Sequence, residues 1–257
     1  MFIDTHVHLN NPKLYQKLDH YITKAFDQNV QALIVIGYDH ETNQKALEIA
    51  DKHDHIYASI GYHPTIAKDL TAADFELLER LLTHPKVVAI GECGLDFYWD
   101  KDHENEQIHV FKKHIELAQK RALPIVVHMR DATEKTYLTL KESAPLKGIM
   151  HCYSGSKEMA DKFIALGLHI SLGGPVTFKN AKTPKDVAKI VPLDKLLIET
   201  DAPYLAPHPY RGKQNDSSLL PLIAQAIAEI KQVSLETIAN HTTANAIKLF
   251  NLKEETK

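Results

Sequence analysis

Short apolar segments recur along the chain, separated by longer segments in which apolar residues fall three and four positions apart. The short segments are rich in Val, Ile and Leu, which is typical of strands buried on both faces of a parallel sheet. We predict eight strands, at residues 2–6, 31–37, 56–61, 87–92, 125–128, 148–151, 169–172 and 196–200.

The segments between the strands have the period of amphipathic helices. Strands and helices alternate throughout, which indicates a parallel sheet with helical crossovers. Eight such repeats in 257 residues favour a closed α/β barrel, the (β/α)8 TIM barrel, over a doubly wound open sheet. The clearest crossover helices are predicted at residues 41–53, 71–83, 104–121, 132–143 and 157–166.

Two more helices are predicted beyond the last strand, at residues 219–230 and 235–250. Ser234 is the expected N-cap of the second, because a hydroxyl before a helix can accept a hydrogen bond from the first turn. We expect this pair to cover one side or one end of the barrel. The pattern contains no linker, low-complexity segment or strong repeat, so we predict one domain over residues 1–257.

Composition and charge narrow the class of protein. A net charge of -3 argues against a broadly basic surface that coats nucleic acid, although local arginines remain possible. Only two cysteines occur, Cys93 and Cys152, and their apolar surroundings indicate buried thiols in a reducing compartment. No apolar run reaches the roughly 18 to 20 residues that span a bilayer. The N-terminus lacks the pattern of a signal peptide, so we expect a cytoplasmic protein without membrane association.

Residues that can carry chemistry gather at the ends of the predicted strands, where the loops of a (β/α)8 barrel build the active site. His6 and His8 lie two positions apart at the end of the first strand, so their side chains should share a face. On each of three later strands, an apolar residue is followed at every second position by two residues with polar groups, so these three side chains should also share a face. These sets are Val126, His128 and Arg130 on the fifth strand, Ile149, His151 and Tyr153 on the sixth, and Leu197, Glu199 and Asp201 on the eighth.

Imidazoles and carboxylates clustered at a barrel mouth cost free energy to desolvate, and a divalent metal ion offsets that cost directly. The set has more donors than one tetrahedral ion uses, so we predict two ions with the Glu92 carboxylate bridging them. Magnesium, manganese and zinc all remain open as the physiological metal. The predicted metal ligands are His6, His8, Glu92, His128, His151 and Asp201.

Other polar and aromatic residues receive simpler interpretations. Most histidines outside the strand ends, including His40 and His114, are expected to be solvated or locally hydrogen-bonded. Aromatic residues in the strand-end loops are expected mainly to pack in the core. Trp99 and Tyr204 are the candidates for stacking on a nucleic-acid base.

Seven motifs in order give the chain a resemblance to a known family. They are FIDTHVHLN at 2–10, IGYHP at 60–64, IGECGLDFYW at 90–99, PIVVHMRDA at 124–132, HCYSGS at 151–156, GPVTFKNA at 174–181 and ETDAPYLAPHPYRGKQN at 199–215. Over essentially its whole length the chain resembles the TatD family of metal-dependent deoxyribonucleases, a branch of the amidohydrolase-like barrels. The resemblance implies the same six metal ligands and magnesium-dependent activity. It also implies His63 and Asp96 at the site, with Arg130 and Arg211 near the phosphate.

These observations predict a hydrolase of phosphodiester bonds that acts exonucleolytically on single-stranded DNA or 3′ ends, through water activated by two metal ions. Glu92 and Asp201 are the expected catalytic residues, and no obligate protein partner is evident. The expected substrate-binding residues are His63, Asp96, Arg130, Tyr153 and Arg211.

Two other functions remain open at the level of the sequence. The same barrel could hydrolyse another bond, such as the ester of a D-aminoacyl-tRNA or an amide. Cyclic-amidohydrolase relatives often bridge their metals with a carboxylated lysine on the fourth strand, where this chain has Glu92. A non-catalytic metal-binding protein is disfavoured, because structural metal sites are usually closed and four-coordinate.

Overall fold

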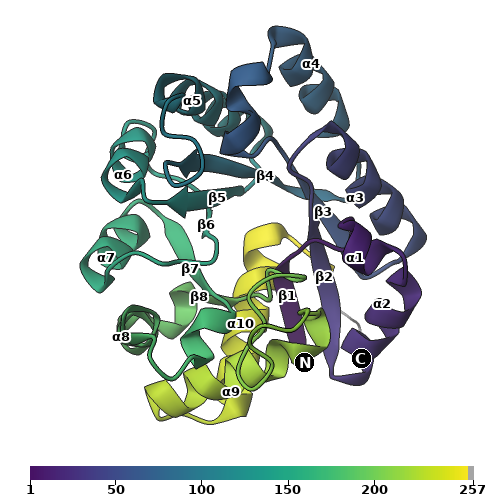
Figure 1. The fold of residues 1–257 in the computed structure, drawn as a ribbon, viewed down its shortest axis with the longest axis vertical. Helices are drawn as coiled ribbons and strands as arrows, with labels where there is room; N and C mark the ends of the chain where they lie inside the picture. Colours follow the sequence, from purple (N-terminus) through teal and green to yellow (C-terminus); the bar gives the residue numbers. More distant parts are fainter. Residues whose placement is uncertain (254–257) are drawn as a thin grey trace.

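Eight parallel strands form one sheet in chain order in the computed structural model, which describes residues 1–253 (Figure 1). Just beyond the last strand, Ala202 forms a parallel bridge with Val7 of the first, so the sheet curls into a nearly closed barrel. The predicted TIM barrel is confirmed. The strands are β1 Phe2–Val7, β2 Val30–Ile36, β3 Ile56–Ile60, β4 Val87–Asp96, β5 Ile125–Arg130, β6 Gly148–Met150, β7 Leu168–Leu172 and β8 Leu196–Ile198.

Helices surround the strands on the outside of the barrel (Figure 1). The α-helices up to β8 are α1 Pro12–Tyr15, α2 Leu18–Asp27, α3 His40–Lys52, α4 Ala72–Leu81, α5 Glu104–Arg121, α6 Thr133–Lys141, α7 Lys157–Ala165 and α8 Lys182–Ile190. Short 3-10 helices are η1 Pro64–Asp69, η2 Gly174–Thr177, η3 Leu193–Lys195 and η4 Ser217–Leu219. Over residues 1–253, no helix has the length and apolar character needed to cross a bilayer.

The two predicted helices beyond β8 are α9 Leu220–Lys231 and α10 Leu235–Phe250. As predicted, the Ser234 side chain caps α10 by accepting a hydrogen bond from the Thr237 N–H. Helix α9 packs beside α8 and against β1 and β8, while α10 contacts the starts of the same two strands. The pair therefore covers one side and one end of the barrel.

The barrel interior is apolar at the end that α10 covers. Val126 and Ile149 point inward from β5 and β6, and they belong to one buried cluster with Leu249 and Phe250 near the end of α10. This packing seals the N-terminal ends of the strands. A ligand can therefore approach the interior only from the C-terminal ends, which we call the mouth of the barrel.

Strand β4 is longer than the sequence pattern predicts, because its pairing with β5 continues as far as Asp96 opposite Arg130. Two glycines with positive φ allow this close pairing. A Cβ atom on Gly91 would lie 2.4 Å from the Val126 carbonyl oxygen, and one on Gly94 would lie 2.0 Å from that of His128. A side chain at either position would push β4 away from β5 and displace the residues that β4 carries to the mouth.

Candidate metal centre

The six predicted metal ligands come together at the mouth. Glu92 lies within the long strand β4, and the other five lie near the end of a strand or just after it. All of them have largely buried side chains. Their donor atoms lie around the two oxygens of the Glu92 carboxylate.

The first group lies at the ends of β1 and β8. His6 Nε2 is 3.3 Å from His8 Nε2, and both nitrogens lie 3.5 to 3.8 Å from Glu92 Oε2. Asp201 Oδ1 is 3.3 Å from His8 Nε2 and 3.7 Å from His6 Nε2. Ligands of a tetrahedral ion with bonds of 2.0 to 2.1 Å are about 3.3 Å apart. The distances of the two imidazole nitrogens to each other and to each carboxylate are therefore close to those around one divalent ion.

The second group lies at the ends of β5 and β6. Glu92 Oε1 is 3.0 Å from His128 Nδ1 and 2.9 Å from His151 Nε2, and these two nitrogens are 3.3 Å apart. His63 Nε2 is also near, at 3.8 Å from the same oxygen. Each oxygen of the Glu92 carboxylate thus faces a different set of nitrogens, which is the position that a bridging ligand needs.

Two outer carboxylates orient the histidines of the second group. Asp96 Oδ2 lies 2.9 Å from His128 Nε2, and Glu199 Oε1 lies 3.3 Å from His151 Nδ1. In each ring the other nitrogen is the one that faces Glu92. A carboxylate on the outer nitrogen fixes the tautomer and aim of a metal-binding histidine.

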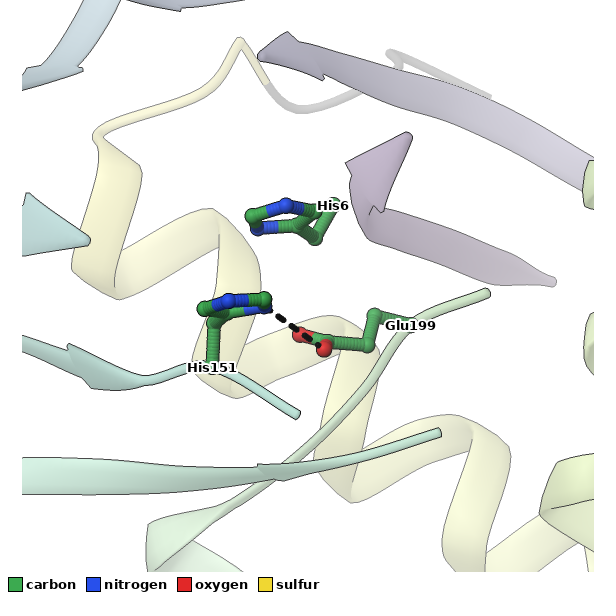
Figure 2. A group of neighbouring side chains, drawn as sticks. All are labelled: His6, His151 and Glu199. Atoms are coloured by element: carbon green, nitrogen blue, oxygen red, sulfur yellow. Dashed lines mark hydrogen bonds and ion pairs between the residues drawn. The ribbon is translucent and has the colours of Figure 1, made fainter. Parts of the chain in front are cut away.

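Glu199 is the residue of the site to which the sequence assigned a phase but no role. Its position two residues before Asp201, in phase with Leu197, was the available signal. Figure 2 shows the stacked rings of His6 and His151, whose centroids are 3.9 Å apart, with the Glu199 carboxylate directed at His151. Its Oε1 also accepts a hydrogen bond from the Cys152 N–H, whereas the buried Oε2 has no partner within residues 1–253.

The surroundings of the mouth favour an ionised Glu92 carboxylate but act on the imidazoles in opposite directions. Burial alone would raise the pKa of Glu92, but the neighbouring His151, His128 and His6 outweigh it and hold that pKa well below its usual value. Burial lowers the pKa of His6, and burial together with the charge of His128 lowers the pKa of His63 to about 3. For His8, His128 and His151, the neighbouring carboxylates outweigh burial and raise the pKa. A metal ion needs the lone pair of a neutral imidazole, so its binding to these three rings competes with their protonation.

Two cavities open onto these donor atoms, and both are lined by Arg130, His128, His151, Asp201 and Leu205. The larger, of about 550 Å³, is also lined by His8, Tyr38, His63, Thr65, Glu92, Asp96, Trp99 and Tyr204. The smaller, of about 280 Å³, is also lined by Met129, Cys152, Tyr153, Ser154, Leu172, Gly173, Pro175, Val176 and Pro184. A hollow of about 710 Å³ between α4 and α5 is lined by none of the predicted site residues.

The predicted substrate-binding residues differ in their relation to these cavities. The Arg130 guanidinium lies 3.9 Å from the centre of the Tyr98 ring and forms no ion pair within the described chain. Tyr153 is a buried wall of the smaller cavity, and its hydroxyl donates to a backbone carbonyl in its own loop. Arg211 lies over Phe178, at 4.5 Å from the ring centre, and lines neither cavity.

Of the two states predicted for His114, solvated or locally hydrogen-bonded, the structure shows the second. His114 is completely buried in α5, where its Nδ1 lies 2.8 Å from the Val110 carbonyl oxygen. Its Nε2 accepts a hydrogen bond from the Tyr62 N–H, in the segment that carries His63. His114 therefore ties the barrel wall to the loop after β3.

A (β/α)8 barrel whose strand ends bring histidines and carboxylates together in this way belongs to the class of metal-dependent hydrolases. The chain is a member of the family of TatD-related DNases, whose model matches residues 3–251.

Individual relatives agree with this assignment. The uncharacterized metal-dependent hydrolase YabD of Bacillus subtilis is 46% identical, over 98% of this chain and 100% of its own. A protein of Erwinia billingiae named 3'-5' ssDNA/RNA exonuclease TatD is 32% identical, over 97% of this chain and 98% of its own. The crystal structure of YJJV, a TatD homolog from Escherichia coli, superposes with a TM-score of 0.93 at 30% identity, covering 98% of both chains.

Proposed function

We propose that this metal-dependent hydrolase is an exonuclease that removes nucleotides from the 3′ end of single-stranded DNA with the help of two divalent ions. The observation that carries the proposal is the Glu92 carboxylate, which directs one oxygen to each of two nitrogen groups. The name of the Erwinia relative, 3'-5' ssDNA/RNA exonuclease, supports both the bond and the direction.

His6, His8 and Asp201 would hold one ion, His128 and His151 the other, and Glu92 would bridge them. Two divalent ions can supply an activated water and stabilise charge on a phosphoryl group, and magnesium, manganese and zinc are all compatible with this mixed donor set. The Asp201 carboxylate turns Oδ1 to the histidines of β1. In this proposal its Oδ2 accepts the proton of the attacking water.

Arg130 favours a phosphodiester over an uncharged amide as the substrate. Its guanidinium lies at the rim of both cavities without a carboxylate partner among residues 1–253, so its charge is free to meet an anion. We propose that Arg130 contacts the scissile phosphate, while His63 and Asp96 help to orient the phosphate. Arg211, more distant on its loop, would meet a neighbouring phosphate of the strand.

Aromatic side chains at the mouth fit the bases of a single strand. Within residues 1–253, the exposed aromatic side chains other than Phe26 lie in two loops of this face, with Tyr98 and Trp99 after β4 and Tyr204 and Tyr210 after β8. Bases of a single strand stack on such rings regardless of sequence. We therefore propose a path for the strand across the larger cavity.

The test is release of nucleotides from 3′-end-labelled single-stranded DNA by protein stripped of metal and then supplied with magnesium, manganese or zinc. Arg130→Ala should slow release by about 10²-fold, the effect of removing one preorganised donor. Arg130→Lys should restore part of the rate, because an ammonium lacks the bidentate contact of a guanidinium. Arg80→Ala, on the exposed surface of α4, is the matched control and should not change the rate.

Two results would contradict the proposal. Absence of DNA cleavage by the wild type with every metal would exclude the nuclease and return the ester and amide alternatives to consideration. An undiminished rate for Arg130→Ala would show that this side chain does not contact the phosphate.

A further inference from the structure

The two cavities of the mouth differ in size and in wall chemistry, although they share the metal-binding side. The larger carries the aromatic side chains Tyr38, Trp99 and Tyr204 together with polar groups of β3 and β4. The smaller lies on the side of β6 and β7, and most of its remaining wall is apolar. A phosphate at the shared wall therefore has a different compartment on each side.

Buried side chains give the smaller cavity fixed walls. Leu172, Val176 and Tyr153 are each exposed by no more than a few per cent, and the Tyr153 ring is anchored through its hydroxyl to the Ser156 carbonyl. Pro175 adds another rigid apolar surface. With about 280 Å³, the compartment can hold one base with its sugar but not two nucleotides.

Gly173 is part of the wall of this compartment. The three nearest neighbours of a Cβ atom there would be the Glu199 backbone oxygen at 3.5 Å, the Glu199 Cγ at 3.7 Å and Pro175 at 3.9 Å, which are ordinary contacts. Its φ of -111° suits any residue. At Gly174, by contrast, a Cβ would lie 1.8 Å from the Leu205 carbonyl oxygen, so that glycine is required by packing. A Cβ can therefore be added to the wall at Gly173, but not at Gly174, without displacing the backbone.

We propose that the smaller cavity is the subsite for the terminal nucleoside of the strand and that the larger cavity holds the nucleotides that precede it. This assignment rests on the proposed exonuclease function. Water adds to the phosphorus, the bond from phosphorus to the 3′ oxygen of the preceding nucleotide breaks, and that oxygen takes a proton. The products are one nucleoside 5′-monophosphate, held in the smaller cavity, and a strand that is shorter by one nucleotide.

The first test fills the smaller cavity from two directions. Gly173→Val adds volume at its inner wall, and Ser154→Trp adds volume at its exposed edge without touching Glu199. Both variants should reduce kcat/KM on single-stranded DNA by at least about tenfold, more for a terminal purine than for a pyrimidine, because steric exclusion grows with base size. The hydrolysis of methyl p-nitrophenyl phosphate, a small activated diester without a base, should fall less than the cleavage of DNA in both variants. Metal content is measured beside both rates, because a side chain at Gly173 meets Glu199.

The second test measures binding in each cavity separately. Trp99 is the only tryptophan of the chain and lines the larger cavity, so its fluorescence, excited selectively over the tyrosines, reports on a base stacked there. A phosphorothioate-linked single strand, which resists hydrolysis, should quench this fluorescence in the wild type and in Gly173→Val. Deoxyadenosine 5′-monophosphate should inhibit the wild type without quenching Trp99, and its inhibition constant should rise at least about tenfold in Gly173→Val.

The outcomes separate this inference from the proposed function. If the wild type cleaves DNA but both cavity variants keep their rates and their inhibition by the monophosphate, the subsite is wrong and the exonuclease stands. Quenching of Trp99 by the monophosphate would place the terminal nucleoside in the larger cavity and overturn the assignment. If the wild type hydrolyses neither DNA nor the small diester, both proposals fail.

Discussion

The two ends of the barrel interior are built on opposite principles. At the N-terminal end, Leu249 and Phe250 of α10 close an apolar cluster that needs no ligand to be stable. At the mouth, buried imidazoles and carboxylates face one another, an arrangement that costs desolvation energy and is compensated only by their mutual contacts and by a bound ion. One end of the barrel therefore contributes stability, and the other uses that stability to hold reactive groups together.

Both ends are encoded in the same strands. In β5, Val126 lies in the apolar interior, His128 follows two residues later at the metal centre, and Arg130 stands at the rim. The period of two keeps all three on one face. Substitutions at the two ends should therefore separate activity from stability, even though the residues are close in sequence.

The largest effect is expected for Glu92→Ala, which removes the proposed bridge. Activity should fall to background, beyond the about 10- to 100-fold cost of losing an outer partner of a metal ligand. The fold should be retained, although the free energy of unfolding should fall, because the buried imidazoles lose the carboxylate that they contact. Rates on single-stranded DNA, metal content and thermal unfolding give the measurement. Full activity with normal metal content would exclude Glu92 as the bridge.

Phe250→Ala is the corresponding change at the sealed end. This side chain is 2% exposed, and its truncation should lower the free energy of unfolding by about 3 to 5 kcal/mol. The rate per folded molecule should stay at the wild-type level, since no metal ligand is touched. Urea unfolding and activity at low temperature provide the readouts. A loss of activity without a loss of stability would contradict the assignment of stability to the sealed end and of activity to the mouth.

Glu199→Gln changes a buried residue that contacts a proposed metal ligand, His151, without being a proposed ligand itself. The glutamine amide keeps the volume of the carboxylate, but its neutral oxygen accepts a weaker hydrogen bond from the His151 Nδ1–H. The affinity for metal should therefore fall by about 10- to 100-fold. Excess metal should restore most of the activity, whereas it should not rescue Glu92→Ala. Metal titration followed by activity at saturation distinguishes the two variants. Unchanged metal affinity would show that Glu199 does not orient His151.

The sequence predicts the barrel well because local patterns determine it. Alternating strand and helix periods, the Ser234 cap and the two final helices are all properties of neighbouring residues, and the structure confirms them. The polar residues at the ends of the predicted strands also supply the six candidate ligands, because closure of the barrel brings all strand ends to one mouth.

The role of Glu199 could not be read in the same way. Its phase places it inside the barrel, but only the structure shows that its carboxylate reaches across β7 to His151, just after β6. The burial of His114 has a similar origin, because its partner Tyr62 is distant in sequence. Contacts between residues far apart along the chain depend on register and side-chain direction, and a single sequence pattern contains neither.

The smallest effect concerns His114, a buried histidine that belongs to neither end and has no carboxylate partner within residues 1–253. Burial lowers its pKa from 6.5 to about 4, although the Val110 carbonyl partly opposes the shift. Below pH 6.5 the unfolded chain binds a proton here that the folded chain does not, so its contribution to stability is complete above pH 6.5 and is lost as the pH falls towards 4. The loss should reach about 2 kcal/mol by pH 5.

The free energy of unfolding is measured between pH 7 and 5 for the wild type and two variants. It should fall less steeply for His114→Gln than for the wild type, whatever the stability of this variant at pH 7. The control His241→Gln, at an exposed position, should keep the wild-type slope. Equal slopes in all three proteins would show that His114 is already protonated in the folded state, and that a buried imidazole here does not need to remain neutral.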